Sequence, residues 1–168
     1  MMRRRTFLST GLAAAAGGAA ISCSRGRHGT RRFFTDEEAR TVDAICAQII
    51  PADRDAGSRE AHVVNYIDVQ LTNHFRKYQR IYRQGIARVD SDSVKRFGKR
   101  FVDLPPGEQT EVLKGTEQNA PAFFALILDH TRQGFYGDPR HGGNYQMSSW
   151  KMLKLPFPPL RGRQHYDG

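Results

Sequence analysis

The sequence is poor in cysteine and tryptophan, and it has no apolar run of the length that a membrane-spanning helix requires. Its 168 residues include two cysteines and one tryptophan. Two cysteines cannot build the disulfide framework on which many small secreted domains depend. The longest mainly apolar run lies between residues 7 and 21, short of the ~20 residues needed to cross a bilayer. A chain of this length can bury a hydrophobic core as one domain.

The sequence also lacks the short motifs that bind common cofactors. It contains no Cys-x-x-Cys-His for haem attachment, no Gly-x-Gly-x-x-Gly and no phosphate-binding loop. No serine or cysteine lies in a nucleophile motif. The six histidines show no two-ligand helical spacing. His130 and His141 flank a glycine-rich loop near Asp129 and Asp138, which leaves a metal-dependent enzyme open as an alternative.

Acidic residues are missing from the N-terminal part of the chain. None precedes Asp36, whereas three arginines lie in the first five positions, and the formal net charge is +9. Between Arg76 and Arg100, basic residues alternate with aromatic ones, a composition that can bind nucleic acid. The same spacing is typical of an amphipathic helix with a solvated cationic face. Because exported proteins rarely meet nucleic acid, and the leader predicts export, we expect no nucleic-acid partner.

The N-terminus has the pattern of a cleavable export signal. A charged start is followed by a short apolar run rich in alanine and glycine. Arg4 and Arg5, followed by Phe7 and Leu8, resemble the twin-arginine type, which is an address for bacterial export read by a receptor. An ordinary signal peptide or a flexible basic tail is the alternative. We therefore predict a twin-arginine signal over residues 1–22 and a periplasmic location.

Cys23 directly follows the predicted signal, and two fates are open for it. The small residues before it suit a signal peptidase, so cleavage in front of Cys23 is one outcome. The same stretch loosely resembles a lipobox, with alanine in place of the usual leucine, and a lipid on Cys23 would tether the protein to a membrane. Residues 23–34, rich in Arg, Gly and Ser, are predicted to form an unstructured linker, and residues 158–168 a flexible tail.

Residues 35–157 show helical periodicity without the sustained alternation of a strand. Thr35 and Glu38 are placed to form a capping box, and the apolar stripe that follows ends at Pro51. Cys46 lies on that stripe and is predicted to be an inert core residue. Further helical patterns begin near residues 61, 106 and 119, with an uncertain break near residue 77. We therefore predict a single compact all-α domain of five or six helices.

The stretch from Asn119 to Pro156 is the most distinctive part of the chain. Its first half is a helix so apolar that we expect it to be central. On this helix only Asp129, His130 and Arg132 are expected to need water. Its second half is a loop rich in glycine and aromatic residues, and its Asp-Pro and Gly-Gly-Asn sequences predict tight turns. Such a loop can hold a fixed shape, either against its own core or against a partner.

This loop and several earlier segments resemble the gluconate 2-dehydrogenase subunit 3 family. The most specific similarity is the run Gly-Phe-Tyr-Gly-Asp-Pro-Arg-His-Gly-Gly-Asn from Gly134 to Asn144. The other similar segments, in chain order, are the leader, Ile49-Ile50-Pro51-Ala52-Asp53, Tyr66-Ile67-Asp68, Leu104-Pro105-Pro106 with Glu108-Gln109, Trp150-Lys151-Met152 and Leu155-Pro156. The resemblance therefore extends over most of the chain from Arg4 to Pro156.

The resemblance implies a non-catalytic accessory subunit of a periplasmic or membrane-associated, FAD-dependent (GMC-type) gluconate or sugar dehydrogenase complex. In such complexes a large subunit carries FAD and the active site, and a cytochrome c subunit with haem often accepts the electrons. The small subunit would bind no cofactor or metal itself. It would lend its twin-arginine address to the large subunit and aid its maturation or docking. A free-standing periplasmic or lipid-tethered binding protein is the alternative.

The resemblance further implies that the C-terminal loop faces the flavoprotein. Tyr136, Tyr145 and Trp150 are of the residue types that anchor interfaces. The predicted interface residues are Phe135, Tyr136, Gly137, Asp138, Pro139, Arg140, Gly142, Gly143, Asn144 and Trp150. The substrate of the complex is left open, because its pocket would lie in another chain, and so is a pairing of Cys46 with a cysteine of the partner.

Overall fold

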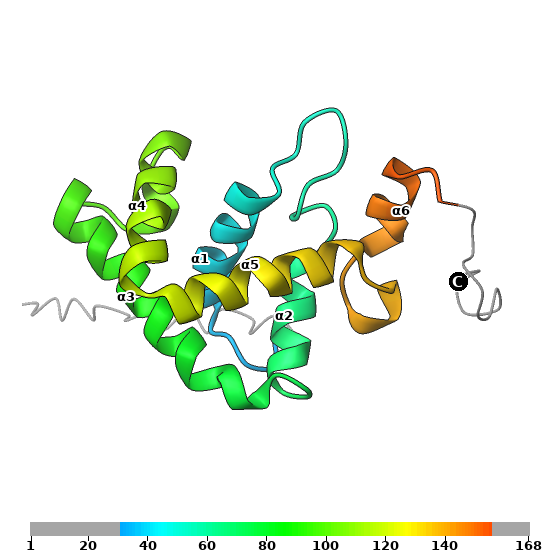
Figure 1. The fold of residues 1–168 in the computed structure, drawn as a ribbon, viewed down its shortest axis with the longest axis horizontal. Coiled ribbons are helices and arrows are strands. Elements are labelled where there is room, and N and C mark those ends of the chain that lie inside the picture. The colour runs from blue at the N-terminus through cyan, green and yellow to red at the C-terminus, as the bar shows by residue number, and fades with distance from the viewer. Residues whose placement is uncertain (1–30, 156–168) are drawn as a thin grey trace, which may run out of the picture.

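The computed structural model describes residues 31–155, and within that range every regular element is a helix (Figure 1). The six α-helices are α1 (Asp36–Ile49), α2 (Val63–Leu71), α3 (Gln79–Phe97), α4 (Pro106–Asn119), α5 (Pro121–Tyr136) and α6 (Ser148–Met152). Four short 3-10 helices connect them: η1 (Arg76–Tyr78), η2 (Phe101–Asp103), η3 (Pro139–His141) and η4 (Tyr145–Met147). The prediction of an all-α fold with five or six helices is confirmed.

Helix α5 is the central element of the fold. It packs against α1, α2, α3 and α4 along its length and against α6 at its C-terminal end (Figure 1). Phe123, Ile127 and Phe135 of α5 are at most 2% exposed, and they join one continuous apolar core. The prediction that this helix is central is confirmed. None of the helices in residues 31–155 combines the length and hydropathy that a membrane span requires.

Local sequence signals set several helix ends. Glu38 N–H donates to the Thr35 hydroxyl at 3.2 Å, and Thr35 N–H donates to the Glu38 carboxylate at 2.9 Å, so the predicted capping box is present. Pro106 begins α4, where its missing N–H costs nothing. The helical pattern is interrupted near residue 77, where the sequence left a break uncertain, because η1 lies there between α2 and α3.

Residues 32–34 pack against the helical domain, although the sequence predicts that they belong to the linker. The Asp68 carboxylate on α2 accepts three backbone N–H groups, from Arg32 at 2.6 Å, Phe33 at 3.0 Å and Phe34 at 2.8 Å. Phe34 is 5% exposed and belongs to the core. The linker prediction is therefore wrong for these residues, because their partners come from a distant part of the chain. Residues 23–30 of the predicted linker lie outside the described residues.

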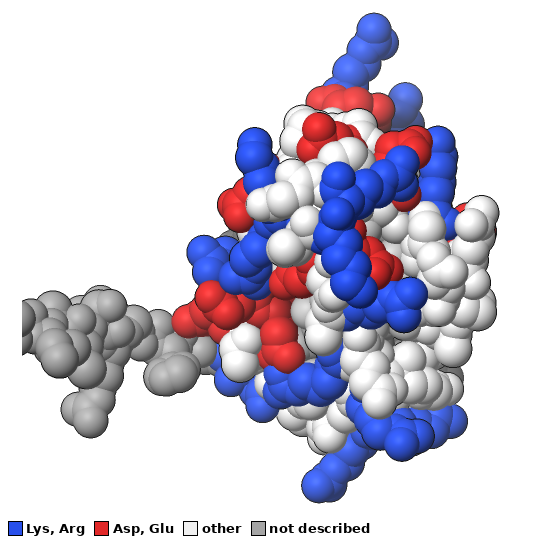
Figure 2. Space-filling view, turned by 90° about the vertical axis from the view of Figure 1, so that its left-hand side faces the viewer, with Lys and Arg blue, Asp and Glu red and all other residues white. Residues whose placement is uncertain are grey.

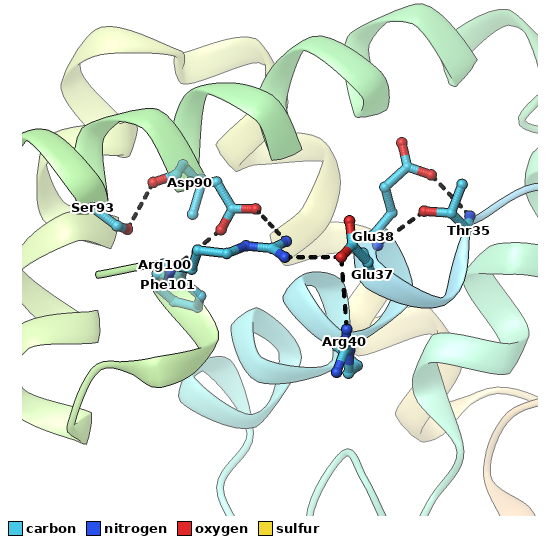
Figure 3. A network of polar contacts seen from close by, with 9 residues as sticks. Thr35, Glu37, Glu38, Arg40, Asp90, Ser93, Arg100 and Phe101 are labelled. Carbon is cyan, nitrogen blue, oxygen red and sulfur yellow. Dashed lines mark hydrogen bonds and ion pairs between the residues drawn. The ribbon is translucent and has the colours of Figure 1, made fainter. Parts of the chain in front are cut away.

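Several basic residues on α3 and just after its end form ion pairs with acidic neighbours. Figure 2 shows blue and red side chains intermixed on the face of the molecule that it draws, with no uniformly basic surface there. Arg100 lies 3.0 Å from Asp90 on α3 and 3.2 Å from Glu37 on α1 (Figure 3). Arg83 on α3 pairs with Glu38, and its guanidinium also donates to the carbonyl of residue 33. These pairs tie the start of α1 to α3, and each exposed pair contributes up to about 1 kcal/mol.

Candidate functional site

His130 lies inside the protein. The expectation that it faces water is therefore wrong. It is 2% exposed, and its ring stacks on Phe75 with centroids 3.8 Å apart. Its Nδ1 atom lies 2.9 Å from the Tyr82 hydroxyl, at hydrogen-bonding distance. Residue 130 shares the buried face of α5 with Ile127 and Thr131. Residue 130 lies three positions after Ile127, a helical spacing that is compatible with burial, but its polar residue type led to the expectation that it faces water.

Burial lowers the pKa of His130 from 6.5 to about 4, with a smaller opposing effect from Asp129. The unfolded chain therefore takes up this proton more readily than the folded one between these two values. We expect the free energy of unfolding to fall by about 2–3 kcal/mol as the pH drops from 6.5 to 4, and by less than about 0.5 kcal/mol more from this group below 4. Urea titrations at several pH values would measure the fall. The His130→Gln variant should lack this component, and an equal fall in both proteins would contradict the assignment.

The described residues provide no cluster of metal ligands. Within residues 31–155, no group of three or more His, Cys, Asp or Glu side chains lies close enough together to hold an ion. His130 contacts Phe75 and Tyr82, whereas His141 lies exposed in η3. Cys46 is fully buried, 3.2 Å from the Thr131 hydroxyl, and burial raises the pKa of its thiol to about 12. The prediction that Cys46 lies in the core is confirmed, and the high pKa disfavours the reactive thiolate form.

Asn144 organises the glycine-rich loop that follows α5. It is fully buried, and its side-chain N–H donates to the Gly137 carbonyl at 2.9 Å. Its side-chain oxygen accepts from both the backbone N–H and the hydroxyl of Ser149, at 3.0 and 2.9 Å. Its backbone N–H donates to the Gly134 carbonyl at 2.8 Å. One amide side chain therefore joins the end of α5, the loop and the start of α6.

Gly143 and Gly142 allow the loop to approach the rest of the domain closely. A Cβ atom at position 143 would lie 2.2 Å from the Gly134 carbonyl oxygen, so only glycine fits there. Gly142 has a φ of 96°, which favours glycine, and its carbonyl accepts from the Asn65 side chain of α2 at 2.7 Å. The loop thus has the fixed shape that its composition predicts, and it holds that shape against its own domain.

The predicted interface residues divide into an inner and an outer set. Phe135 and Asn144 are at most 1% exposed and Gly143 is also buried, while Trp150 is 9% exposed with its Nε1–H donating to the Tyr136 carbonyl at 2.9 Å. The side chain of Tyr136 is 46% exposed. The remaining predicted residues lie at or near the surface: Gly137, Asp138, Pro139, Arg140 and Gly142. The inner set shapes the segment, and the outer set lies at or near the surface.

The structure also exposes apolar residues that are missing from the predicted interface. Tyr145, Leu153 and Leu155 are 48%, 49% and 44% exposed. Tyr145 stacks on the ring of His62, with centroids 4.1 Å apart. We refer to Tyr136, Tyr145, Leu153 and Leu155 as the C-terminal patch. Tyr145 was recognisable by its residue type, but the two leucines follow no regular period that could have signalled their exposure.

The predicted export-signal residues and the candidate modification site cannot be placed. Arg4, Arg5, Phe7 and Leu8, together with Cys23, lie outside the described residues. The first residue that the structure describes is Arg31, which lies 3.5 Å from Asp36 at the start of α1. The described domain therefore begins eight residues after Cys23, counting positions 24 to 31.

The fold and this site define a class: a small all-helical domain whose fixed C-terminal loop presents apolar side chains. A model of the family described as Gluconate 2-dehydrogenase subunit 3 matches residues 36–156 of the chain. The chain therefore belongs to the gluconate 2-dehydrogenase subunit 3 family, which confirms the resemblance seen in the sequence. The matched range contains all six α-helices and the whole C-terminal patch. Comparisons with curated proteins and with solved structures gave no match.

Proposed function

We propose that this chain is the small accessory subunit of a periplasmic, FAD-dependent gluconate or sugar dehydrogenase complex. In this proposal the partner flavoprotein holds FAD and performs the oxidation, and a cytochrome c subunit can accept the electrons. This chain holds no cofactor and contributes binding surface and an export address. The observation that carries the proposal is the family match over residues 36–156, since the family is a subunit of an oxidoreductase complex.

Two properties of the chain support an accessory role. The leader, with Arg4 and Arg5 before an apolar run, has the pattern of a twin-arginine signal, and such a signal can serve a partner that is exported with its carrier. The C-terminal patch presents large apolar side chains on a fixed loop, an arrangement that suits a binding surface. Both features concern transport and contact, and neither needs catalytic groups in this chain.

Export of the partner provides the direct test. Changing Arg4 and Arg5 to lysine keeps the charge of the leader but removes the arginine pair, so we expect this chain and the flavoprotein both to remain in the cytoplasm. Cell fractionation, with flavin absorbance of the periplasmic fraction, would measure this. The matched control is Arg25→Lys with Arg27→Lys, which makes the same change outside the predicted signal. A flavoprotein that still reaches the periplasm beside the Arg4/Arg5 variant would show that the address is not shared.

A second experiment tests membership of the complex itself. The tagged wild-type chain would be purified from its own periplasm, and the absorbance spectrum of the product recorded. Flavin bands together with a larger chain, with or without haem bands, are the expected result. A colourless and solitary protein would contradict the proposed subunit and favour a free-standing binding protein.

A further inference from the structure

The exposed apolar residues gather at one end of the molecule. In residues 31–155, five large hydrophobic side chains are exposed, and four of them form the C-terminal patch. The fifth, Val94, lies on α3. In Figure 1, α6 stands at the right-hand end of the fold, whereas the C-terminal part of α3 lies at the left-hand end. The patch is therefore a local feature of the segment from the end of α5 to residue 155, and Val94 provides an isolated comparison far from it.

The patch is held rigidly by the residues beneath it. Trp150 donates through Nε1–H to the Tyr136 carbonyl, and its own carbonyl accepts the N–H of Leu155 at 3.0 Å. Tyr145 N–H donates to the carbonyl of residue 61 at 3.1 Å, which fixes the other side of the loop to the start of α2. A surface fixed in advance loses little conformational freedom on binding, and this favours affinity.

The backbone of this segment adopts conformations that ordinary residues avoid. Five non-glycine residues in the described range have positive φ, and four of them lie here: Asn144, Gln146, Met147 and Lys154. For the residues other than Asn144, this conformation costs about 1–2 kcal/mol each. Strain of this kind persists where surrounding contacts enforce it, and it is concentrated at functional surfaces. The segment thus keeps an unfavourable backbone shape that points its apolar side chains outward.

The charges around the patch are mostly positive. Between residues 136 and 155 the basic residues are Arg140, Lys151 and Lys154, and the single acidic residue is Asp138. Asp138 is bonded to the Arg140 guanidinium at 2.7 Å, so it does not offset the two lysines. Lys151 and Lys154 are exposed and flank Leu153 in the sequence. This segment therefore combines exposed apolar side chains with a net positive charge.

We propose that the C-terminal patch is the docking surface for the flavoprotein subunit, and that the matching face of that subunit is apolar at its centre and acidic at its rim. This inference rests on the proposed function. An apolar centre provides most of the affinity, and complementary rim charges raise the association rate and fix the orientation. The buried residues Phe135, Gly143, Asn144 and Trp150 act as supports beneath the surface and make no direct contact with the partner.

One substitution at the centre tests the proposal. Leu153→Asp places a charge in the apolar centre without removing a buried group. Tagged chain would be purified from its own periplasm, and flavin absorbance measured per mole of tagged chain. We expect at least a tenfold loss for Leu153→Asp and no loss for Val94→Asp. The control is closely matched, because Leu153 and Val94 are both 49% exposed. Thermal unfolding should be the same for the two variants.

Charge reversal at the rim tests the acidic character of the partner. With the copurified flavoprotein isolated as the probe, Lys151→Glu with Lys154→Glu should slow association about tenfold at low salt. The difference should shrink as ionic strength rises, because added ions screen rim charges. The pair Lys95→Glu with Lys99→Glu, on exposed positions at the end of α3, should bind like the wild type.

The outcomes separate the docking surface from the proposed function. A wild-type chain that brings no flavin with it would overturn the proposed function and this partner together. Flavin retained equally by the wild type and Leu153→Asp would overturn the docking surface alone. Self-association of the wild-type chain that is lost in Leu153→Asp, measured by sedimentation, would assign the patch to a second copy of this chain and overturn the flavoprotein as its partner.

Discussion

Replacing Asp68 with asparagine is expected to lower the free energy of unfolding by about 2–4 kcal/mol. The Asp68 side chain is almost fully buried, at 2% exposure, and its two oxygens accept the N–H groups of Arg32, Phe33 and Phe34. An asparagine amide offers one oxygen and one NH2 group, so at least one backbone N–H would face another donor. The carboxylate also makes the stronger, charge-assisted bonds. Urea denaturation of the two proteins would measure the loss.

A control substitution separates this effect from a general loss of negative charge. Asp103→Asn makes the same change at an exposed position of η2, and we expect its effect to stay within about 0.5 kcal/mol. The Asp68 variant should also become sensitive to proteases near residues 31–34, because those residues lose their anchor. Equal stability of the Asp68 and Asp103 variants would mean that the three N–H groups find other partners, and that Phe34 stays packed without the carboxylate.

The helical fold was predictable because its signals are local. The capping box of Thr35 and Glu38, the proline at the start of α4 and the periodic apolar stripes each depend on residues that are close in sequence. The anchoring of residues 32–34 was not predictable in this way. Its acceptor, Asp68, lies 34 to 36 positions further along the chain. The composition of an Arg-Gly-Ser-rich stretch does not indicate such a distant partner.

The candidate site was predictable in place but not in orientation. The composition of the loop predicts its turns and its fixed shape, and in the structure both occur at the glycine positions. An irregular loop has no period, however, so the sequence could not tell that Asn144 points inward while Tyr136 points outward. The buried His130 is a different case. There the residue lies at helical spacing from Ile127, but the polarity of the side chain led to the wrong expectation that it faces water.

Gly85 and Gly115 illustrate the same difference between local and distant information. Each lies within a helix, α3 and α4 respectively, and sequence alone predicts that alanine would stabilise both by up to about 1 kcal/mol. In the structure, the surroundings of the two glycines differ. A Cβ atom at position 85 would lie 2.1 Å from the ring of Phe123 on α5, whereas position 115 has nothing within 4 Å. Glycine at position 85 is what allows α3 and α5 to approach closely.

We therefore expect opposite results from the same substitution. Gly85→Ala should lower the free energy of unfolding by about 2–3 kcal/mol, because Phe123 is 2% exposed and cannot move aside freely. Gly115→Ala should raise it by up to about 1 kcal/mol. Denaturant titrations of both variants would measure the difference. If both variants were more stable than the wild type, the protein would lack the close contact between α3 and Phe123.

A double substitution shows whether the contact with Phe123 is the cause. Phe123→Ala alone should destabilise the protein, because it leaves a cavity in the core around α5. Alanine at position 123 lacks the Cγ and Cδ atoms that the new methyl group of Gly85→Ala would meet. In the double variant, the loss of stability should therefore be smaller than the sum of the two single losses by at least about 1 kcal/mol. If the two losses of stability were fully additive, the effect of Gly85→Ala would come from the backbone of α3 and not from the contact with Phe123. The helix crossing that holds α5 at the centre of the fold would then depend on other contacts.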